Sequence, residues 1–250
     1  MKIYNSILQS KKNQKKLFAI LIDPENTNTE QLRSIVKKSN KAQIDLFLIG
    51  GSLITKHTSL EKSIEMIKNL SNIPVIIFPG GIMDISDKAD GILFLSLISG
   101  RNPEMLIGNH VLAAPRLKNS SIEVISTGYI LIDTGSQTSV SYMSNTNPIP
   151  YDKHNIATST SIAGEMLGLK MIYLEGGSGA QTPISNEMIR AAKQSVSIPI
   201  IVGGGINSGD IALEKCKAGA DIIVVVNAIE KNETLIQEIS DSIHQYKNDK

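Results

Sequence analysis

Short apolar runs alternate along the whole chain with longer segments of helical spacing. The runs are continuous rather than alternating, so each predicts a strand that is buried on both faces, as in a parallel sheet. Eight such runs occur, at residues 17–22, 44–49, 75–78, 92–95, 123–132, 170–174, 200–202 and 222–226.

The segments between most of the runs are predicted to be helices. Residues 60, 64 and 67, all Leu or Ile, fall on one helical face. Thr27 and Glu30 fit a capping box that would start an earlier helix, and Ile162, Met166 and Leu169 share a face of a later one. Eight strand–helix units in 250 residues are typical of an α/β fold, the (β/α)8 TIM barrel, and we expect one such domain over residues 1–250.

An internal repeat supports the barrel. The sequence FLIGGS at 47–52 resembles YLEGGS at 173–178, and IPVIIFPGGI at 73–82 resembles IPIIVGGGI at 198–206, both offset by about half the chain. The glycines recur in the two halves, whereas Ile49 stands where Glu175 does. Residues 134–150, rich in Ser, Thr, Asn and Pro, predict a long, mobile loop over the barrel mouth.

Three late strands end in loops that could bind phosphate: two are rich in glycine, at residues 176–179 and 203–205, and the third is Val226-Asn227 at the start of a short helix. In this fold the active site lies at the carboxyl ends of the strands, and phosphate binds after the late ones. Glycine lets backbone N–H groups approach an anion, and helix N-termini attract it. The alternative is that these glycines only form tight turns.

Three side chains at strand ends are candidates for chemistry. Glu175 directly precedes the first glycine loop, where it could act as a general base beside a bound phosphate. Asp23 and Ser52 follow the first two strands and could offer oxygen ligands to Mg²⁺. The alternatives are an N-cap or loop role for Asp23 and a turn role for Ser52. Asp133 is interpreted as a loop-ordering residue.

Composition narrows the class of protein. With 41% hydrophobic and 20% charged residues the chain is expected to fold, and a net charge of +1 gives no indication of a nucleic-acid partner. The single cysteine, Cys216, excludes an internal disulfide and fits a reducing cytosol. The four histidines lack zinc-ligand spacing. Residues 17–22 follow several lysines but are too short for a signal peptide or a transmembrane segment.

The chain resembles the geranylgeranylglyceryl phosphate synthase family (PcrB-like proteins) over nearly its whole length. The stretch at 93–103 is similar to the second of the family's two sequence groups, which has archaeal and bacterial members. The motifs that carry the resemblance are residues 21–24, 49–52, 78–80, 93–103, 127–130, 163–168, 173–180, 202–206 and 227–230.

The resemblance implies a Mg²⁺-dependent prenyltransferase. The family joins the C3 hydroxyl of sn-glycerol 1-phosphate to a prenyl diphosphate through an ether bond and releases diphosphate. We expect a C20 donor, geranylgeranyl diphosphate, with a longer heptaprenyl donor as the alternative. The prenyl chain needs an apolar groove, for which residues 95–98 are one candidate, and the barrel could carry a modified helix or loop there.

The resemblance also implies roles for residues. Glu175 would take the proton and Tyr173 would orient the reactants, while Asp23 and Ser52 would hold Mg²⁺. Departures from the family pattern are Asn26, where a lysine is expected and Lys56 or Arg101 could compensate, and Val226, where a glycine is expected. The residues implied to bind glycerol 1-phosphate are Tyr173, Leu174, Glu175, Gly176, Gly177, Ser178, Gly179, Gly203, Gly204, Gly205, Val226 and Asn227.

Two other functions stay open. One is an isomerase or lyase on a phosphate-binding barrel, although such chemistry usually needs a second acid or a lysine at a strand end. The other is a phospholigand-binding barrel without catalysis. The resemblance further implies a cytoplasmic homo-oligomer, and the terminal lysines are consistent with transient contact with a membrane surface.

Overall fold

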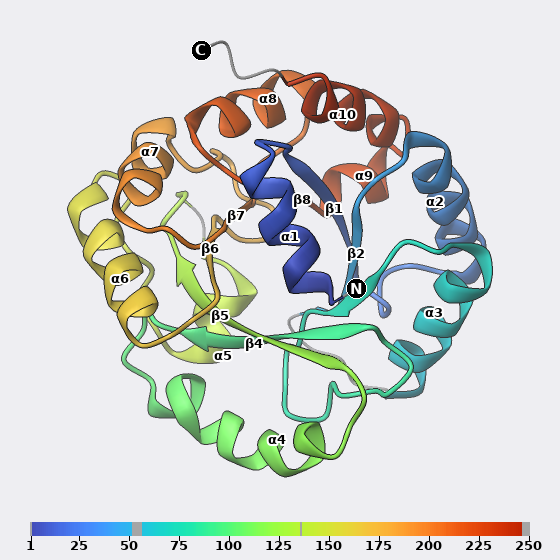
Figure 1. The fold of residues 1–250 in the computed structure, drawn as a ribbon, viewed down its shortest axis with the longest axis horizontal. Coiled ribbons are helices and arrows are strands. Elements are labelled where there is room, and N and C mark those ends of the chain that lie inside the picture. The colour runs from blue at the N-terminus through green and yellow to red at the C-terminus, as the bar shows by residue number, and fades with distance from the viewer. Residues whose placement is uncertain (1, 52–56, 136, 247–250) are drawn as a thin grey trace.

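The computed structural model describes residues 2–51, 57–135 and 137–246. Eight parallel strands close into a barrel in chain order, with β8 pairing back to β1 (Figure 1). The predicted TIM barrel and its eight strands are confirmed. The strands are β1 Leu17–Ile22, β2 Leu46–Ile49, β3 Val75–Ile77, β4 Gly91–Leu97, β5 Glu123–Leu131, β6 Met171–Glu175, β7 Ile200–Gly203 and β8 Ile222–Val225.

Helices surround the barrel. In the described part of the chain they are α1 Ile3–Lys12, α2 Thr29–Ala42, α3 His57–Leu70, the π-helical turn η1 Glu104–Gly108, α4 Asn109–Lys118, α5 Ser139–Ser144, α6 His154–Met166, α7 Asn186–Ser195, α8 Gly209–Ala218, α9 Asn227–Lys231 and α10 Leu235–His244. None of these helices is long and apolar enough to cross a bilayer.

Each strand contributes side chains to two separate cores. In β1, Phe18 and Ile20 pack with the surrounding helices, while Leu17 and Ala19 pack inside the barrel. Both faces of the strand are therefore buried, which is why the apolar runs in the sequence are continuous.

The connection from β3 to β4 contains no helix. Residues 78–90 form turns, in which the backbone N–H groups of Gly80 and Gly81 donate to the carboxylate of Asp84 at 3.0 and 2.9 Å. The ring of helices is accordingly open between α3 and α4 (Figure 1). This agrees with the expectation of a modified barrel, and it leaves the outer face of β4 without a helix of the preceding unit above it.

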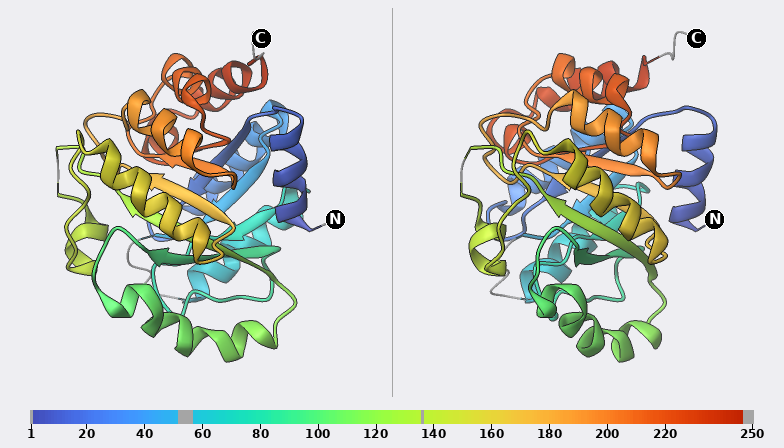
Figure 2. Two further views of the ribbon diagram at one scale, coloured as in Figure 1. Left: turned by 60° about the vertical axis from the view of Figure 1, so that its left-hand side comes forward. Right: turned by 90° about the vertical axis from the view of Figure 1, so that its left-hand side faces the viewer.

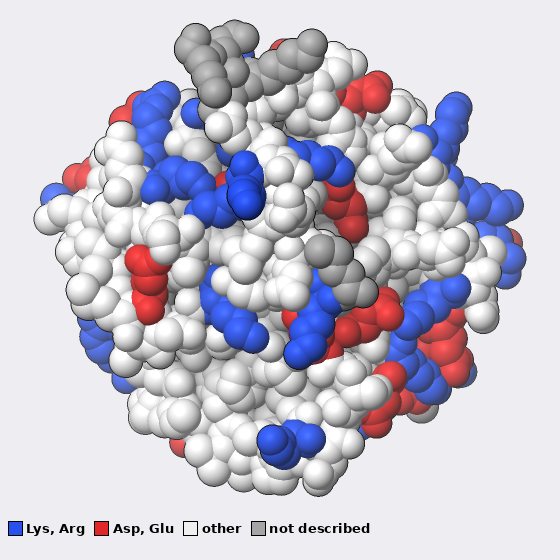
Figure 3. Space-filling model, viewed as in Figure 1, with Lys and Arg blue, Asp and Glu red and all other residues white. Residues whose placement is uncertain are grey.

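Helix α1 closes one end of the barrel. Ile3 and Ile7 are buried in the barrel interior, and the carboxylate of Glu123 accepts from the first backbone N–H groups of the helix, including that of Tyr4 at 3.2 Å. Figure 2 shows α1 and α5 at opposite ends of the molecule. Acidic and basic side chains are interspersed on the α1 face (Figure 3), so neither sign dominates there. A functional site is therefore expected at the opposite end of the barrel, where the strands have their carboxyl ends.

Two predictions about helices are wrong. The N-cap of α2 is Asn28 rather than Thr27, because the Asn28 side chain accepts from the backbone N–H of Gln31 at 2.9 Å. Ile162, Met166 and Leu169 do not form the buried face of α6. The helix ends at Met166, which is 83% exposed, and its buried face runs through residues 157, 161 and 164.

The segment 134–150 is not a loop throughout, because it contains α5. The Thr138 side chain caps this helix in a capping box with Ser141. Val140 of α5 lines the space above the barrel, so the segment does lie over the mouth as predicted.

Candidate active site

A polar cleft lies at the carboxyl ends of the strands, at the end of the barrel away from α1. Residues that follow β1, β2, β6, β7 and β8 converge on it although they are far apart in the sequence. Its lining includes Asp23, Asn26, Gly51, Phe78, Tyr129, Val140, Glu175, Gly177, Ser178, Gly179, Gly204, Gly205, Val226, Asn227, Glu230 and Lys231.

Glu175 lies at the base of this cleft. The alternation of β6 turns its side chain into the barrel, where it is only 7% exposed. Burial raises the pKa of its carboxyl to about 7, because the charged form loses its solvation; the backbone N–H of Gly177, which donates to Oε1 at 2.5 Å, and the nearby Tyr173 hydroxyl partly offset this rise. A carboxyl with a pKa near neutrality can accept or donate a proton under ordinary conditions.

Tyr173 lies below Glu175 on the same face of β6 and is fully buried. Gly203 pairs with Glu175 across β6 and β7, and a Cβ atom at Gly203 would lie 2.6 Å from the Tyr173 hydroxyl and 3.1 Å from Oε2 of Glu175. The absence of a side chain at Gly203 therefore makes room for both functional groups. No residue in the described ranges forms a hydrogen bond with the Tyr173 hydroxyl.

Three aromatic rings form the floor of the cleft. Tyr129 packs edge-to-face on Tyr173 and on Phe78, with ring centroids 5.3 and 5.9 Å apart. Burial and the charge of Glu175 raise the pKa of the Tyr129 hydroxyl well above its usual value. Sequence reasoning gave Tyr129 no role; the signal was its place inside the 127–130 motif, two residues before the end of β5.

The glycine loops after β6 and β7 pack against each other. Gly204 has a φ of +91°, and a Cβ there would lie 2.7 Å from the backbone of Gly176, so a side chain is excluded both sterically and conformationally. The hydroxyl of Ser178 donates to the side-chain oxygen of Asn227 at 2.9 Å, which joins the β6 loop to the start of α9. These contacts build one backbone-lined cradle from three loops.

The predicted glycerol phosphate residues divide into two groups. Those in the cradle line the cleft: Glu175, Gly177, Ser178, Gly179, Gly204, Gly205, Val226 and Asn227. Four others lie behind the lining: Leu174 faces the outer core, and Tyr173, Gly176 and Gly203 support the lining residues from below.

Carboxylates gather on the opposite side of the cleft. Asp23 accepts from the backbone N–H of Glu25 at 2.9 Å and from the Asn26 amide at 2.8 Å, and it packs against Gly51. Burial raises the pKa of the Glu230 carboxyl, and the charge of the nearby Asp23 adds to this rise. Lys231, beside it, is the one cationic side chain among the described residues that line the cleft.

Ser52 and Lys56 lie outside the described residues. Within the described ranges, no three His, Cys, Asp or Glu side chains come together as a metal-binding cluster. A Mg²⁺ ion at Asp23 would therefore need further oxygen ligands from a bound substrate, which is how proteins commonly hold Mg²⁺ beside phosphates.

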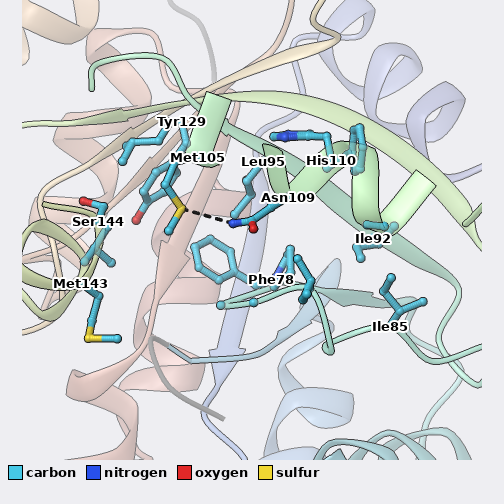
Figure 4. A pocket seen from close by; sticks show the side chains of 18 of the residues that line it. Phe78, Ile85, Ile92, Leu95, Met105, Asn109, His110, Tyr129, Met143 and Ser144 are labelled. Atoms are coloured by element: carbon cyan, nitrogen blue, oxygen red, sulfur yellow. Dashed lines mark hydrogen bonds between the residues drawn. The ribbon is translucent and has the colours of Figure 1, made fainter. Parts of the chain in front are cut away.

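An apolar groove opens from the polar cleft, and both share Gly51, Phe78, Tyr129 and Val140 (Figure 4). The groove runs under η1 and α4, where the missing β3–β4 helix would otherwise lie. Leu95 lines it as predicted, whereas Ile98 does not. Further lining residues, which sequence reasoning missed, include Ile85, Ile92, Phe94, Met105, Asn109, His110, Ala113, Leu117 and Met143.

His110 gives the groove wall a polar element. Its Nε2 lies 3.0 Å from the Ser96 hydroxyl, and its ring meets Phe94 edge-to-face. Burial lowers the pKa of the imidazole, so the neutral form is favoured and the groove stays uncharged there.

The remaining candidates lie away from the cleft. Asp133 accepts from the backbone N–H of Gly135 at 3.0 Å, which fits the predicted loop-ordering role. Arg101 donates to the carbonyl of Gly100 at 2.7 Å, outside the polar cleft, so a compensating role is not favoured in this arrangement. Cys216 is buried in α8, as expected for a core residue.

Comparisons with known proteins show the family of this chain. A family model described as the PcrB family matches residues 9–243. Geranylgeranylglyceryl phosphate synthase from Chitinophaga pinensis is 52% identical over 97% of this chain and 96% of its own length. The protein of the same name from Spirosoma linguale is 47% identical over 93% of each chain.

A solved structure extends the likeness to three dimensions. The crystal structure of (S)-3-O-geranylgeranylglyceryl phosphate synthase from Thermoplasma acidophilum in complex with sn-glycerol-1-phosphate superposes with a TM-score of 0.93 and 32% identity, covering 98% of this chain and 100% of that one. The resemblance read from the sequence and the predicted class of enzyme, a prenyl-transferring transferase, are confirmed. The chain belongs to the PcrB family, whose members include the geranylgeranylglyceryl phosphate synthases.

Proposed function

We propose that this protein forms the ether bond between the C3 hydroxyl of sn-glycerol 1-phosphate and a long prenyl diphosphate. The observation that carries the proposal is one continuous space. A buried carboxyl with a pKa of about 7 lies beside a backbone-lined cradle, and this polar cleft opens directly into an apolar groove. A phosphorylated alcohol fits the cradle, and a hydrocarbon chain fits the groove.

The cradle would hold the phosphate of sn-glycerol 1-phosphate. Ser178, Gly179, Gly204 and Gly205 line the cleft and would offer their backbone N–H groups to it, whereas the N–H of Gly177 already donates to Glu175. Helix α8 begins at Gly209 and α9 at Asn227, after the β7 and β8 strands. Backbone donors suit a dianion because they are fixed in place before it binds. Val226 can still donate its N–H, although its side chain takes space that a glycine would leave free.

Glu175 would serve as the general base. Its carboxylate takes the proton of the C3 hydroxyl as the new carbon–oxygen bond forms, while the bond from the prenyl carbon to the diphosphate oxygen breaks and diphosphate leaves with the bonding pair. Tyr173 and Tyr129 position the carboxylate and close the floor, so that bulk water is kept from the reacting carbon.

The acidic side of the cleft would receive the diphosphate with Mg²⁺. Asp23 fits this role because Mg²⁺ prefers oxygen ligands and needs only one or two carboxylates when phosphate oxygens complete its shell. When bound, the ion would neutralise charge on the leaving diphosphate. Lys231 would contact a diphosphate oxygen from the same side, in place of a lysine at Asn26.

The apolar groove would hold the prenyl chain. Phe78 and Tyr129 stand at its junction with the polar cleft, so the reacting carbon would lie beside them and the chain would extend toward Ile85, Ile92 and Leu117. A C20 donor is our proposal, with a heptaprenyl donor as the alternative. A cytoplasmic location and homo-oligomers remain predictions that accompany it.

A product assay tests this function. Purified protein is incubated with sn-glycerol 1-phosphate or sn-glycerol 3-phosphate and with C15, C20 or C35 prenyl diphosphates, with and without Mg²⁺, and ether products are measured by mass spectrometry. We expect product from the 1-phosphate with the C20 donor and Mg²⁺. No ether product in any combination would exclude the reaction.

Glu175→Gln separates catalysis from mere binding. The variant keeps the shape of the side chain but cannot accept the proton, so turnover should fall by about 100-fold or more while sn-glycerol 1-phosphate still binds. A variant with wild-type turnover would show that Glu175 is not the base. Binding without any turnover in the wild type would instead favour the phospholigand-binding alternative.

A further inference from the structure

The side chain of Glu230 is placed unusually for an acid. Its Oε1 atom is buried, and it has no hydrogen-bond partner within the described residues. Leaving a carboxylate oxygen buried and unpartnered costs free energy, because the atom has lost water and gained nothing in return. Because Glu230 also lines the cleft, its carboxylate is placed to gain a partner that arrives with a ligand.

The surrounding contacts hold Glu230 in this position. The side-chain amide of Gln31 in α2 donates to the backbone carbonyl of Glu230 at 3.1 Å, which fixes the end of α9 against α2. Three residues further on, Glu233 accepts from Lys38 at 2.6 Å. Helix α9 and the turn after it are therefore each held against α2, and Glu230 lines the cleft.

Asp23 lies on the same side of the cleft. Its carboxylate is fixed by the N–H of Glu25 and by the amide of Asn26, both of which leave lone pairs available. Two carboxylates thus line one side of a cleft that is proposed to accept a diphosphate. The two carboxylates would repel the diphosphate unless a cation lay between them and it.

We propose that Glu230 is a second carboxylate, alongside Asp23, for the divalent cation that enters this cleft with the diphosphate. The proposal rests on the proposed function for the identity of the anion. It assigns Asp23 and Glu230 to the cation and leaves Lys231 for an oxygen of the diphosphate. Two carboxylates plus phosphate oxygens make an ordinary ligand set for Mg²⁺.

The other acid of the cleft does not fit this role. Glu175 already accepts from Gly177 and lies on the side of the glycine cradle, beside the Tyr173 hydroxyl. A cation there would compete with the proton that the base must take. The acidic pair and the base are therefore separate parts of the cleft.

Cation binding is measured apart from turnover. Mn²⁺ replaces Mg²⁺ as a paramagnetic probe, and the enhancement of water-proton relaxation reports Mn²⁺ that is bound to the slowly tumbling protein. Wild type, Glu230→Gln, Glu230→Asp and Asp23→Asn are titrated with Mn²⁺ in the presence and absence of inorganic diphosphate. Glu214→Gln, at an exposed acid of α8, is the matched control.

Glu230→Gln should weaken Mn²⁺ binding in the presence of diphosphate by about 10- to 100-fold. Glu230→Asp should lose less, Asp23→Asn should also weaken binding, and Glu214→Gln should match the wild type. The affinity for sn-glycerol 1-phosphate should be unchanged in Glu230→Gln, which also shows that the variant is folded.

Three results would overturn the assignment. They are unchanged Mn²⁺ binding in Glu230→Gln, no protein-bound Mn²⁺ in the wild type with diphosphate, or an equal loss of glycerol phosphate binding in Glu230→Gln. If the wild type still makes ether product, such a result removes the role of Glu230 and leaves the proposed function intact. If no ether product forms at all, the proposed function fails first.

Discussion

At the scale of single residues, the same burial that would suit Glu175 to the proposed role of base works against the stability of the fold. The carboxyl is held in the barrel, where its charged form is poorly solvated, and its pKa is raised from 4.5 to about 7. The folded state therefore keeps the proton over a pH range in which the unfolded chain has lost it. Protein stability must fall as pH rises through this range.

This linkage predicts a pH-dependent gain in stability for Glu175→Gln. Between pH 4.5 and 7 the wild type should lose up to about 3 kcal/mol more unfolding free energy than the variant, because the variant lacks the Glu175 proton. Urea denaturation at several pH values measures the difference. The exposed control Glu214→Gln should follow the wild type, and an advantage of Glu175→Gln that is already complete at pH 4.5 would contradict the explanation.

Gly203 lies beside the proposed base but does not line the cleft. In Gly203→Ala the new methyl group would meet the Tyr173 hydroxyl and the Glu175 carboxylate, so both must shift. A displacement of this kind is expected to lower kcat by about 100-fold. The affinity for sn-glycerol 1-phosphate, measured by calorimetry, should change much less, because the cradle glycines are separate. Equal losses in both quantities would instead point to a collapse of the whole site.

At the scale of elements, the groove lies where the helix between β3 and β4 is missing, under η1 and α4. Residues 78–90 connect β3 to β4 without a helix, while η1 and α4 pass over the outer side chains of β4. Aliphatic and aromatic side chains from both elements line the space between them. The length of this space under α4 should therefore limit the prenyl chain.

Ala113 offers a test of that limit. Its small side chain lines the groove from α4, so Ala113→Trp should obstruct the distal part and shift the preference from the C20 toward the C15 donor by about tenfold or more. Ala114→Trp is the matched control, because Ala114 is exposed and does not line the groove. The ratio of kcat/KM values for the two donors measures the effect. An unchanged ratio in Ala113→Trp would show that the prenyl chain does not lie in this groove.

At the scale of the whole molecule, one end of the barrel is closed by packing and the other carries the candidate site. Helix α1 seals one end with Ile3 and Ile7, and every candidate catalytic residue within the described ranges lies at the other. This separation is general in the fold, in which loops at the carboxyl ends of the strands carry function. Changes in the seal should therefore alter stability and leave the chemistry alone.

Ile7→Ala tests this division. The side chain is 2% exposed, so its truncation should lower the free energy of unfolding by about 2 to 5 kcal/mol. Leu8→Ala, at the neighbouring and partly exposed position, should change it far less. At a temperature where both variants are folded, kcat should equal that of the wild type, and a loss of kcat in Ile7→Ala would show that the two ends are coupled.

The number, order and type of the strands were predictable from the sequence because parallel strands in a barrel are buried on both faces. Burial on both faces requires a continuous apolar run at each strand, such as residues 17–22 for β1. Strand ends were predictable too, since Glu175 and its glycines interrupt such a run. Local details were less so: Thr27 and Asn28 are both good caps, and only the path of the chain into α2 selects Asn28.

By itself, then, the sequence determined the barrel, the end at which its site lies and the acid that ends β6, because these follow from local periodicity and from where apolar runs stop. Only the tertiary structure decided what those residues meet. Closure of the barrel buries Glu175 against Tyr173 and Gly203, opens a groove between the β3–β4 loop and α4, and brings Glu230 to the side of the cleft that holds Asp23. Such contacts join residues distant in the chain, and their energies depend on burial, which no local pattern contains.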